Sequence, residues 1–134
     1  MKLTLKKLFF IFIIAFILNA VWENLHSMLY DNYMGGEITQ FILLRATLSD
    51  AIYIVLMVLP FIFYPALKKR DWLIIIFGFI VSICIEYYAL GAGRWAYNSL
   101  MPIIPLLGIG LTPTIQLGLL GYVSFKLAEK PSSL

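Results

Sequence analysis

Long apolar runs separated by short polar segments dominate the chain of 134 residues. Four of these runs are long enough to cross the hydrocarbon core of a bilayer, which takes about 20 residues of α-helix. They lie near residues 7–30, 40–66, 72–91 and 103–127. The pattern therefore predicts an all-α membrane protein, a bundle of four transmembrane helices that forms a single transmembrane domain over residues 1–134.

The composition indicates that lipid, rather than water, surrounds most of the chain. Hydrophobic residues make up 62% of it, charged residues make up 13%, and the mean hydropathy is +0.93. Soluble domains carry roughly 45–50% apolar and about 25% charged residues. The first run is also compatible with a signal peptide, but no small-residue cleavage site follows it, so we expect a retained helix.

The basic residues predict the orientation of the helices. They precede the first run, separate the second from the third, and follow the fourth: Lys2, Lys6, Lys7, Lys68, Lys69, Arg70, Lys126 and Lys130. In the other two connections, Arg94 is the single Lys or Arg residue. Because cytoplasmic loops are enriched in Lys and Arg, we expect both termini in the cytoplasm (N-in/C-in) and a multi-pass location in the plasma (inner) membrane.

Polar side chains inside the runs gather at one depth. Helices rise about 1.5 Å per residue, which places the polar residues of all four runs between the midplane and the outer surface. They are Asn19, Glu23, His26, Arg45, Thr47, Ser49, Asp50, Ser82, Glu86, Thr112, Thr114 and Gln116. The first three recur at intervals of four and three and therefore share one helix face. The sequence predicts a polar cavity in the outer half of the bundle.

Ionisable residues within membrane spans are costly and mark functional sites by default. We expect Glu23, Asp50 and Glu86 to be the catalytic acid–base groups of this cavity. We expect the ligand to be bound by Asn19, His26, Arg45, Arg94, Trp95, Tyr97 and Gln116. The structural alternative is that Arg45 pairs with Asp50 or Glu23 and that the amides and hydroxyls form ordinary interhelical hydrogen bonds.

Glycines and prolines mark the ends of the runs. Because glycines permit a sharp turn, the segment Gly91-Ala92-Gly93-Arg94-Trp95-Ala96-Tyr97 is expected to fold Arg94 back onto a carboxylate, with Trp95 and Tyr97 as a cover. Gly35-Gly36 predicts the break between the first two runs. Pro113 is expected to bend the fourth helix at the depth of the cavity.

Several classes of site are disfavoured by the sequence. Cys84 is the sole cysteine, so neither a disulfide framework nor a metal-binding cysteine pair is expected. His26, a lone histidine among scattered carboxylates, lacks the ligand spacing of a metal site. The net charge of +3 follows from the loops described above. We therefore expect no metal, no cofactor and no nucleic-acid partner.

The motifs resemble those of a group of small four-span bacterial membrane proteins. The likeness rests on Asn19-x-x-Trp22-Glu23, Asp50, and Glu86 followed by Gly-Arg-Trp-x-Tyr, Met-Pro and Gly-x-Gly-Leu-x-Pro-x-x-Gln. It covers most of the chain and implies a four-helix fold with a site at these residues, but no established activity. Small multidrug transporters and the sterol isomerase and sigma-2-receptor-like proteins are similar in architecture alone.

Three functions remain open at this point. The first is the binding of an amphiphilic ligand, a lipid or isoprenoid from the outer leaflet, and its modification by carboxylate chemistry. The second is a small proton-coupled transporter that works as a homodimer. The third is a subunit or assembly factor of a membrane complex. We favour the first, with membrane lipids as partners, and the sequence leaves open whether the protein is an enzyme.

Overall fold

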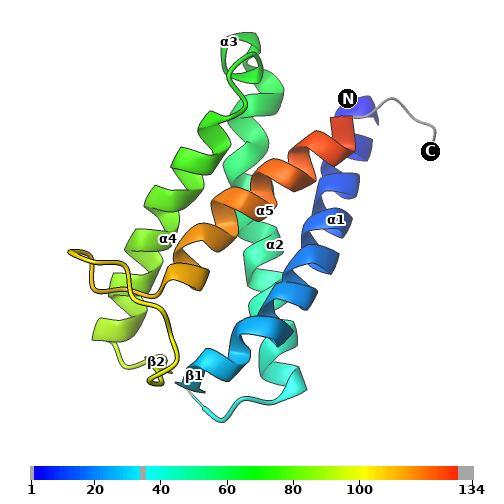
Figure 1. Cartoon of the computed structure of the whole chain (residues 1–134). Coiled ribbons are helices and arrows are strands. Elements are labelled where there is room, and N and C mark those ends of the chain that lie inside the picture. Colours follow the sequence, from blue (N-terminus) through cyan, green and yellow to red (C-terminus); the bar gives the residue numbers. More distant parts are fainter. Residues whose placement is uncertain (1, 34–35, 130–134) are drawn as a thin grey trace.

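The computed structural model describes residues 2–33 and 36–129, and it is mainly helical (Figure 1). Its long helices are α1 (Lys2–His26), α2 (Gln40–Phe63), α4 (Leu73–Gly91) and α5 (Leu111–Glu129). The short elements are η1 (Ser27–Leu29), β1 (Tyr30–Asn32), α3 (Pro65–Lys68) and β2 (Ala96–Tyr97). This architecture agrees with the expected all-α class. Gly35 and Lys130, which entered the predictions above, lie outside the described residues.

Three helices in this part of the chain are long and apolar enough to cross a membrane, namely Lys2–Leu29, α2 and α4. The bounds of α2 and α4 lie close to those of the predicted runs. The helix α5 is not among the three, because Thr112, Thr114 and Gln116 make it less apolar.

The predicted fourth run, 103–127, is wrong at its N-terminal end. Residues 103–110 form a loop, in which Leu106 and Gly108 have left-handed φ angles of 72° and 71°. Such angles, together with Pro105, are incompatible with a continuous helix. Because α5 begins only at Leu111, Pro113 lies in its first turn, where a proline has no intrahelical hydrogen bond to lose. The expected bend at Pro113 is therefore absent.

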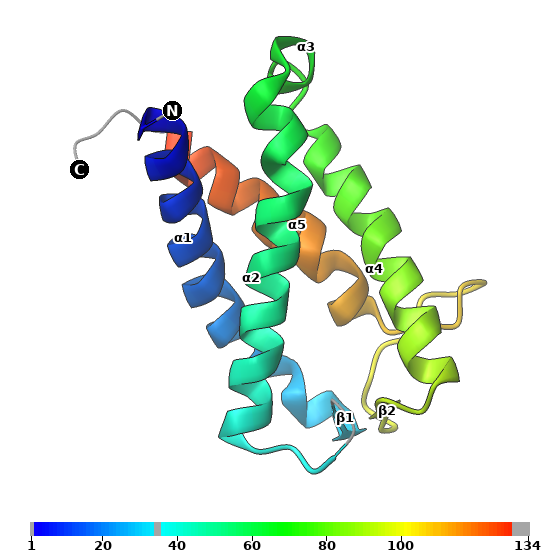
Figure 2. The same ribbon diagram turned by 180° about the vertical axis from the view of Figure 1, so that it is seen from behind.

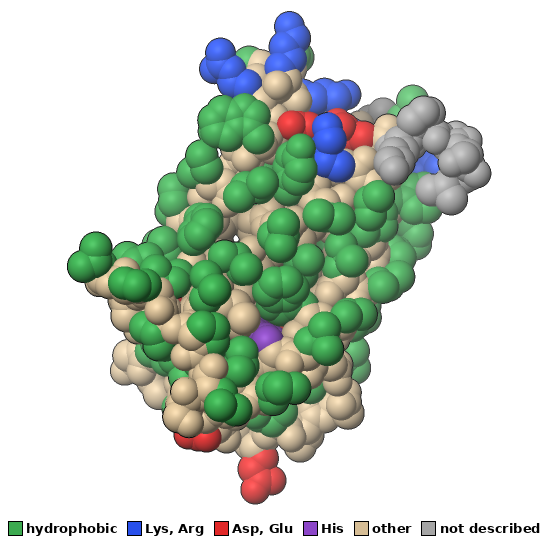
Figure 3. Space-filling view, in the orientation of Figure 1, with side chains coloured by type: hydrophobic (Ala, Val, Ile, Leu, Met, Phe, Trp, Pro, Cys, Tyr) green, Lys and Arg blue, Asp and Glu red, His purple; other side chains and the backbone are tan. Residues whose placement is uncertain are grey.

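The helix α1 buries its polar residues from Asn19 to His26, whereas its exposed stripe is apolar. Its buried residues recur every three or four positions: Ile11, Ala15, Asn19, Glu23 and His26. Its exposed stripe consists of Phe9, Ile13, Ile17 and Val21. Surface helices of soluble proteins have the opposite arrangement. Figure 3 shows apolar side chains over the middle of the molecule, a distribution typical of a membrane-embedded protein.

One end of the bundle is basic. The N-terminal end of α1, the helix α3 and the C-terminal end of α5 lie at this end (Figures 1 and 2), and Figure 3 shows Lys and Arg side chains gathered there. Lys126 Nζ lies 2.8 Å from Asp71 Oδ2, and Lys7 Nζ lies 3.5 Å from Glu129 Oε1. These ion pairs connect α5 to α1 and to the turn before α4. We call this the basic end, and the opposite one the β1–β2 end.

The helix α5 crosses the bundle from α4 to α1 (Figure 1). Nine of its 19 residues are buried, compared with five of 25 in α1. At the crossing with α4, a Cβ atom added to Gly78 would lie 2.2 Å from Gly118 Cα, so only glycine permits this approach. Towards the basic end the core is filled by large apolar side chains: Ile11, Ile54, Phe61, Ile74 and Phe125.

Candidate functional site

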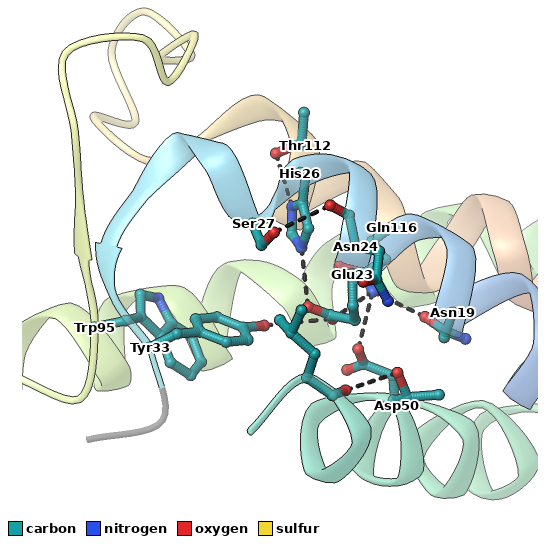
Figure 4. Close-up of polar contacts among 12 residues, drawn as sticks. Asn19, Glu23, Asn24, His26, Ser27, Tyr33, Asp50, Trp95, Thr112 and Gln116 are labelled. Carbon is teal, nitrogen blue, oxygen red and sulfur yellow. Dashed lines mark hydrogen bonds and ion pairs between the residues drawn. The ribbon is translucent and has the colours of Figure 1, made fainter. Parts of the chain in front are cut away.

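A buried polar cluster lies where α1, α2 and α5 meet, with Gln116 at its centre (Figure 4). Gln116 Nε2 donates to Asn19 Oδ1 at 2.8 Å, to Glu23 Oε1 at 2.9 Å and to Asp50 Oδ2 at 2.9 Å. The side chains of Asn19 and Glu23 are fully buried. The structure thus brings together polar residues from three of the four predicted runs.

The Gln116 amide has more acceptor neighbours than hydrogens to donate. Its amide nitrogen carries two hydrogens, but three acceptor oxygens surround it. Reversing the amide would place its oxygen against these same oxygens, so the neighbours fix its orientation. Glu23 Oε1 and Asp50 Oδ2 both lie 2.9 Å from this same nitrogen, so the two carboxyl groups are close neighbours. Two carboxyl groups this close to each other favour holding one proton between them.

Within this pair, Glu23 is the carboxyl group that hydrogen-bond donors surround. Its Oε2 lies 3.1 Å from His26 Nε2, and its Oε1 accepts a hydrogen bond from the Tyr33 hydroxyl at 3.3 Å. His26 Nδ1 lies 3.1 Å from Thr112 Oγ1, which orients the imidazole. Burial raises the pKa of Tyr33 well above its ordinary value, so its hydroxyl keeps its proton and remains a donor to Glu23.

Glu86 forms a second buried centre on α4. Its Oε1 accepts hydrogen bonds from Trp95 Nε1 at 3.4 Å and from the Tyr97 hydroxyl at 2.5 Å. The backbone N–H of Gly110 donates to the same hydroxyl at 3.0 Å. Burial and the hydrogen bond to Glu86 raise the pKa of Tyr97. Trp95 and Tyr97 therefore cover a carboxylate, as the sequence predicted.

Arg94 follows a left-handed turn at Gly93, whose φ angle is +71°. The helix α4 ends at this turn in the way that glycine commonly ends helices. The expected contact of Arg94 with a carboxylate is wrong, because the ion pairs found in residues 2–33 and 36–129 include neither Arg94 nor Arg45. The alternative pairing of Arg45 with Asp50 or Glu23 is wrong for the same reason.

Both arginines instead line a groove of about 510 Å³ between α2 and α4. These helices are close together near α3 and separate towards the β1–β2 end (Figure 2). The groove is lined by Tyr33, Arg45, Ala46, Ser49, Asp50, Tyr53, Cys84, Ile85, Tyr88, Ala89, Arg94 and Trp95. Asp50 belongs to this lining, whereas Glu23 and Glu86 do not. Asp50 is therefore the carboxyl group through which the buried cluster reaches the groove.

A second, smaller cavity of about 30 Å³ lies deeper in the bundle. Asp50, Ser82, Glu86 and Gln116 contribute to its lining. Its size suits one water molecule, and the buried Ser82 Oγ has no hydrogen-bond partner in the described part of the chain. Because Asp50 lines both cavities, it lies between the groove and Glu86.

Aromatic side chains close the site at the β1–β2 end. Tyr30 of β1 pairs with Tyr97 of β2, and the Tyr33 ring lies 4.7 Å from the Tyr30 ring and 5.0 Å from the Trp95 ring between centroids. The sequence did not identify Tyr33 or Thr112 as site residues. Thr112 was noticed only as part of the polar layer, and Tyr33 lies in a connection where no helical spacing indicates its position.

The carboxyl and imidazole groups of the site are engaged in hydrogen bonds rather than arranged as ligands of a cation. Across the described ranges, no group of three His, Cys, Asp or Glu side chains is placed to hold a metal ion. The site itself offers carboxyl, imidazole, phenol and guanidinium groups.

Comparison of the chain with models of protein families, with curated proteins and with solved structures finds no match. The resemblance to small four-span bacterial proteins thus stays a hypothesis that rests on its motifs. The function has to be argued from the geometry of the site.

Proposed function

We propose that the protein crosses the plasma (inner) membrane four times, with α5 as the fourth span and both termini in the cytoplasm. The basic end supports this orientation, because Lys and Arg are enriched in cytoplasmic loops. The burial of α5 supports its role as a span, because polar residues in a membrane face the bundle interior rather than lipid. The β1–β2 end then faces outward.

We further propose that the protein binds an amphiphilic ligand, a lipid or an isoprenoid, in the groove between α2 and α4. The observation that carries this proposal is a groove of about 510 Å³ whose wall contains Asp50, a carboxyl group that belongs to the buried Gln116 cluster. Ligand sites in proteins have volumes of about 300–1,000 Å³. Since the large side chains of Tyr53 and Tyr88 are exposed beside it, the ligand enters sideways from the outer leaflet.

The Glu23–Asp50 pair is the centre that exchanges protons with this ligand. Asp50 faces the groove and transfers the shared proton to an unsaturated carbon of the ligand. The pair then carries a second negative charge, which hydrogen bonds from Gln116 and His26 stabilise until the proton returns. A proton released from a neighbouring carbon returns to Asp50, so the net reaction is a double-bond isomerisation. Positioned acid–base groups of this kind contribute roughly 10²–10⁴-fold to a rate.

Deuterium incorporation tests the proposed chemistry. The purified protein is incubated in D₂O with a lipid extract from the membranes of its own host, and the extract is then examined by mass spectrometry. One amphiphile should acquire carbon-bound deuterium, and Asp50→Asn should slow this at least about 100-fold. Cys84→Ser, also on the groove wall but without a carboxyl group, should retain the rate. An extract left unlabelled by the wild-type protein contradicts the proton exchange.

The apolar core disfavours the transporter as a second function. A proton-coupled path needs polar groups on both sides of the cluster, whereas Ile11, Ile54, Phe61, Ile74 and Phe125 fill the half nearer the basic end. The assembly-factor alternative has no particular contact in its favour. The groove remains the feature that either alternative would have to explain.

A further inference from the structure

We infer that the ligand carries a phosphate headgroup and that Arg45 and Arg94 bind it. This inference rests on the proposed amphiphile site and adds the chemical class of its ligand. The two arginines come from different elements, α2 and the turn after α4, yet they line the same groove as Asp50. Their convergence on one space is the first argument for an anion there.

The second argument is that the neighbouring acids are already engaged. Asp50 accepts a hydrogen bond from Gln116, and Glu86 accepts from Trp95 and Tyr97. Across residues 2–33 and 36–129, no carboxylate forms an ion pair with either arginine. Arg45 lies within the span α2, where an arginine is unfavourable without a partner. A bound anion would supply that partner for both guanidinium groups.

The shape of the anion follows from guanidinium chemistry. Arginine presents a planar fork of N–H donors that matches two oxygens of a phosphate or carboxylate. A phosphate has enough oxygens to accept from two such forks at once. An uncharged headgroup would leave both forks without a counter-charge, and a free phosphate would leave the apolar walls at Ala46 and Ile85 uncovered.

The order of residues along the groove orients the ligand. Arg45 lies near the start of α2, and Tyr53 lies roughly 12 Å further along the helix axis. Arg94 follows the end of α4, whereas Cys84 lies about two turns before that end. The arginines therefore mark the β1–β2 end of the groove. A headgroup bound there places the apolar chain along Asp50 and towards Tyr53 and Cys84.

The sole cysteine of the chain reports on occupancy of the groove. Cys84 is exposed and belongs to the groove lining, so a bound acyl chain should shield it from alkylation by a maleimide. The full-length protein is prepared in a neutral maltoside detergent, which carries no phosphate. Phosphatidic acid, diacylglycerol with the same acyl chains, and inorganic phosphate are added separately, and the alkylation rate of Cys84 is followed by mass spectrometry.

Phosphatidic acid should slow alkylation of Cys84, and diacylglycerol should do so only at much higher concentration. Arg45→Gln and Arg94→Gln should each weaken the protection by phosphatidic acid roughly tenfold, a difference of about 1.4 kcal/mol in binding. Arg45→Lys, which keeps the charge but loses the fork, should fall between wild type and Arg45→Gln. Arg70→Gln, at the basic end, is the matched control and should leave the protection unchanged.

Each remaining outcome separates this inference from the proposed function. Equal protection by diacylglycerol and phosphatidic acid, insensitive to both arginine variants, would leave an amphiphile site and overturn the phosphate headgroup. Protection by inorganic phosphate alone would indicate a free-anion site and would overturn the lipid. Absence of protection by all three additions would overturn both the headgroup and the proposed amphiphile site.

Discussion

The two sides of α4 differ in how closely the neighbouring helix approaches. On one side, Gly78 lies against Gly118 of α5 so closely that a Cβ atom would meet backbone. On the other side, α4 and α2 leave a groove of about 510 Å³ between them. The residues that line this groove are all larger than glycine, and they include two arginines. One helix thus has a sealed side and an open side.

This difference separates the residues that hold the fold from those that are available to a ligand. The sealed side has no room for another molecule, and its glycines act by permitting close packing. The open side keeps charged and aromatic groups whose contacts within the chain are incomplete. Between the two lies the Gln116 cluster, which is buried like the first but reaches the second through Asp50. Substitutions on the sealed side, in the Gln116 cluster and in the groove should therefore affect stability to different extents.

The largest effect on stability is expected on the sealed side. Gly78→Ala places a methyl group against the backbone of Gly118 and forces the helices apart, at a cost of about 3 kcal/mol. Thermal unfolding in neutral detergent, followed by circular dichroism, measures this loss. Gly121→Ala on α5 is the matched control, because its Cβ would meet neighbours only at 3.5–3.7 Å. A Gly78→Ala protein as stable as Gly121→Ala would contradict the sealed contact.

An intermediate effect is expected at the cluster. Gln116→Leu removes the donor shared by Asn19, Glu23 and Asp50, and unsatisfied buried acceptors should lower the free energy of unfolding by about 2 kcal/mol. In an Asp50→Asn background the loss should be smaller, since the new amide provides its own donor. The same thermal measurement gives the four values of this cycle. Additive effects would mean that Gln116 and Asp50 do not interact.

The smallest effect on stability is expected in the groove. Arg45→Gln removes a side chain that makes no ion pair in the described structure, so stability in neutral detergent should stay within about 0.5 kcal/mol of wild type. Binding of an anionic lipid should fall nonetheless. A marked loss of stability in lipid-free protein would restore the structural alternative, in which Arg45 holds the bundle together.

The sequence predicted the helices correctly wherever an apolar run also has helical backbone conformation. The start of α2 at Gln40 was predicted because polar residues precede the second apolar run, and the end of α4 at Gly91 because glycines end the third. The loop over residues 103–110 was missed because its side chains are as apolar as those of a helix. Hydropathy does not register the left-handed angles at Leu106 and Gly108 that prevent helix formation.

The site was predictable within a helix but not between helices. The spacing of Asn19, Glu23 and His26 indicated one buried face, because that face depends only on helical periodicity. The contacts of Gln116 with three helices depend on how each helix is rotated and tilted, which spacing does not specify. The missing ion pair between Arg45 and Asp50, by contrast, follows from spacing within α2, because residues five apart do not share a helix face.

Cross-linking from two adjacent positions on α4 tests the central claim, that a specific amphiphile occupies the groove. Tyr87 and Tyr88 are both exposed, but Tyr88 lines the groove, whereas the Tyr87 hydroxyl bonds to the Leu107 carbonyl. A benzophenone amino acid replaces each in turn, and the protein is irradiated in its native membrane. Position 88 should capture one amphiphile far above its share of the bulk lipid, and position 87 should capture bulk lipids in proportion. The same mixture of lipids at both positions would contradict the claim.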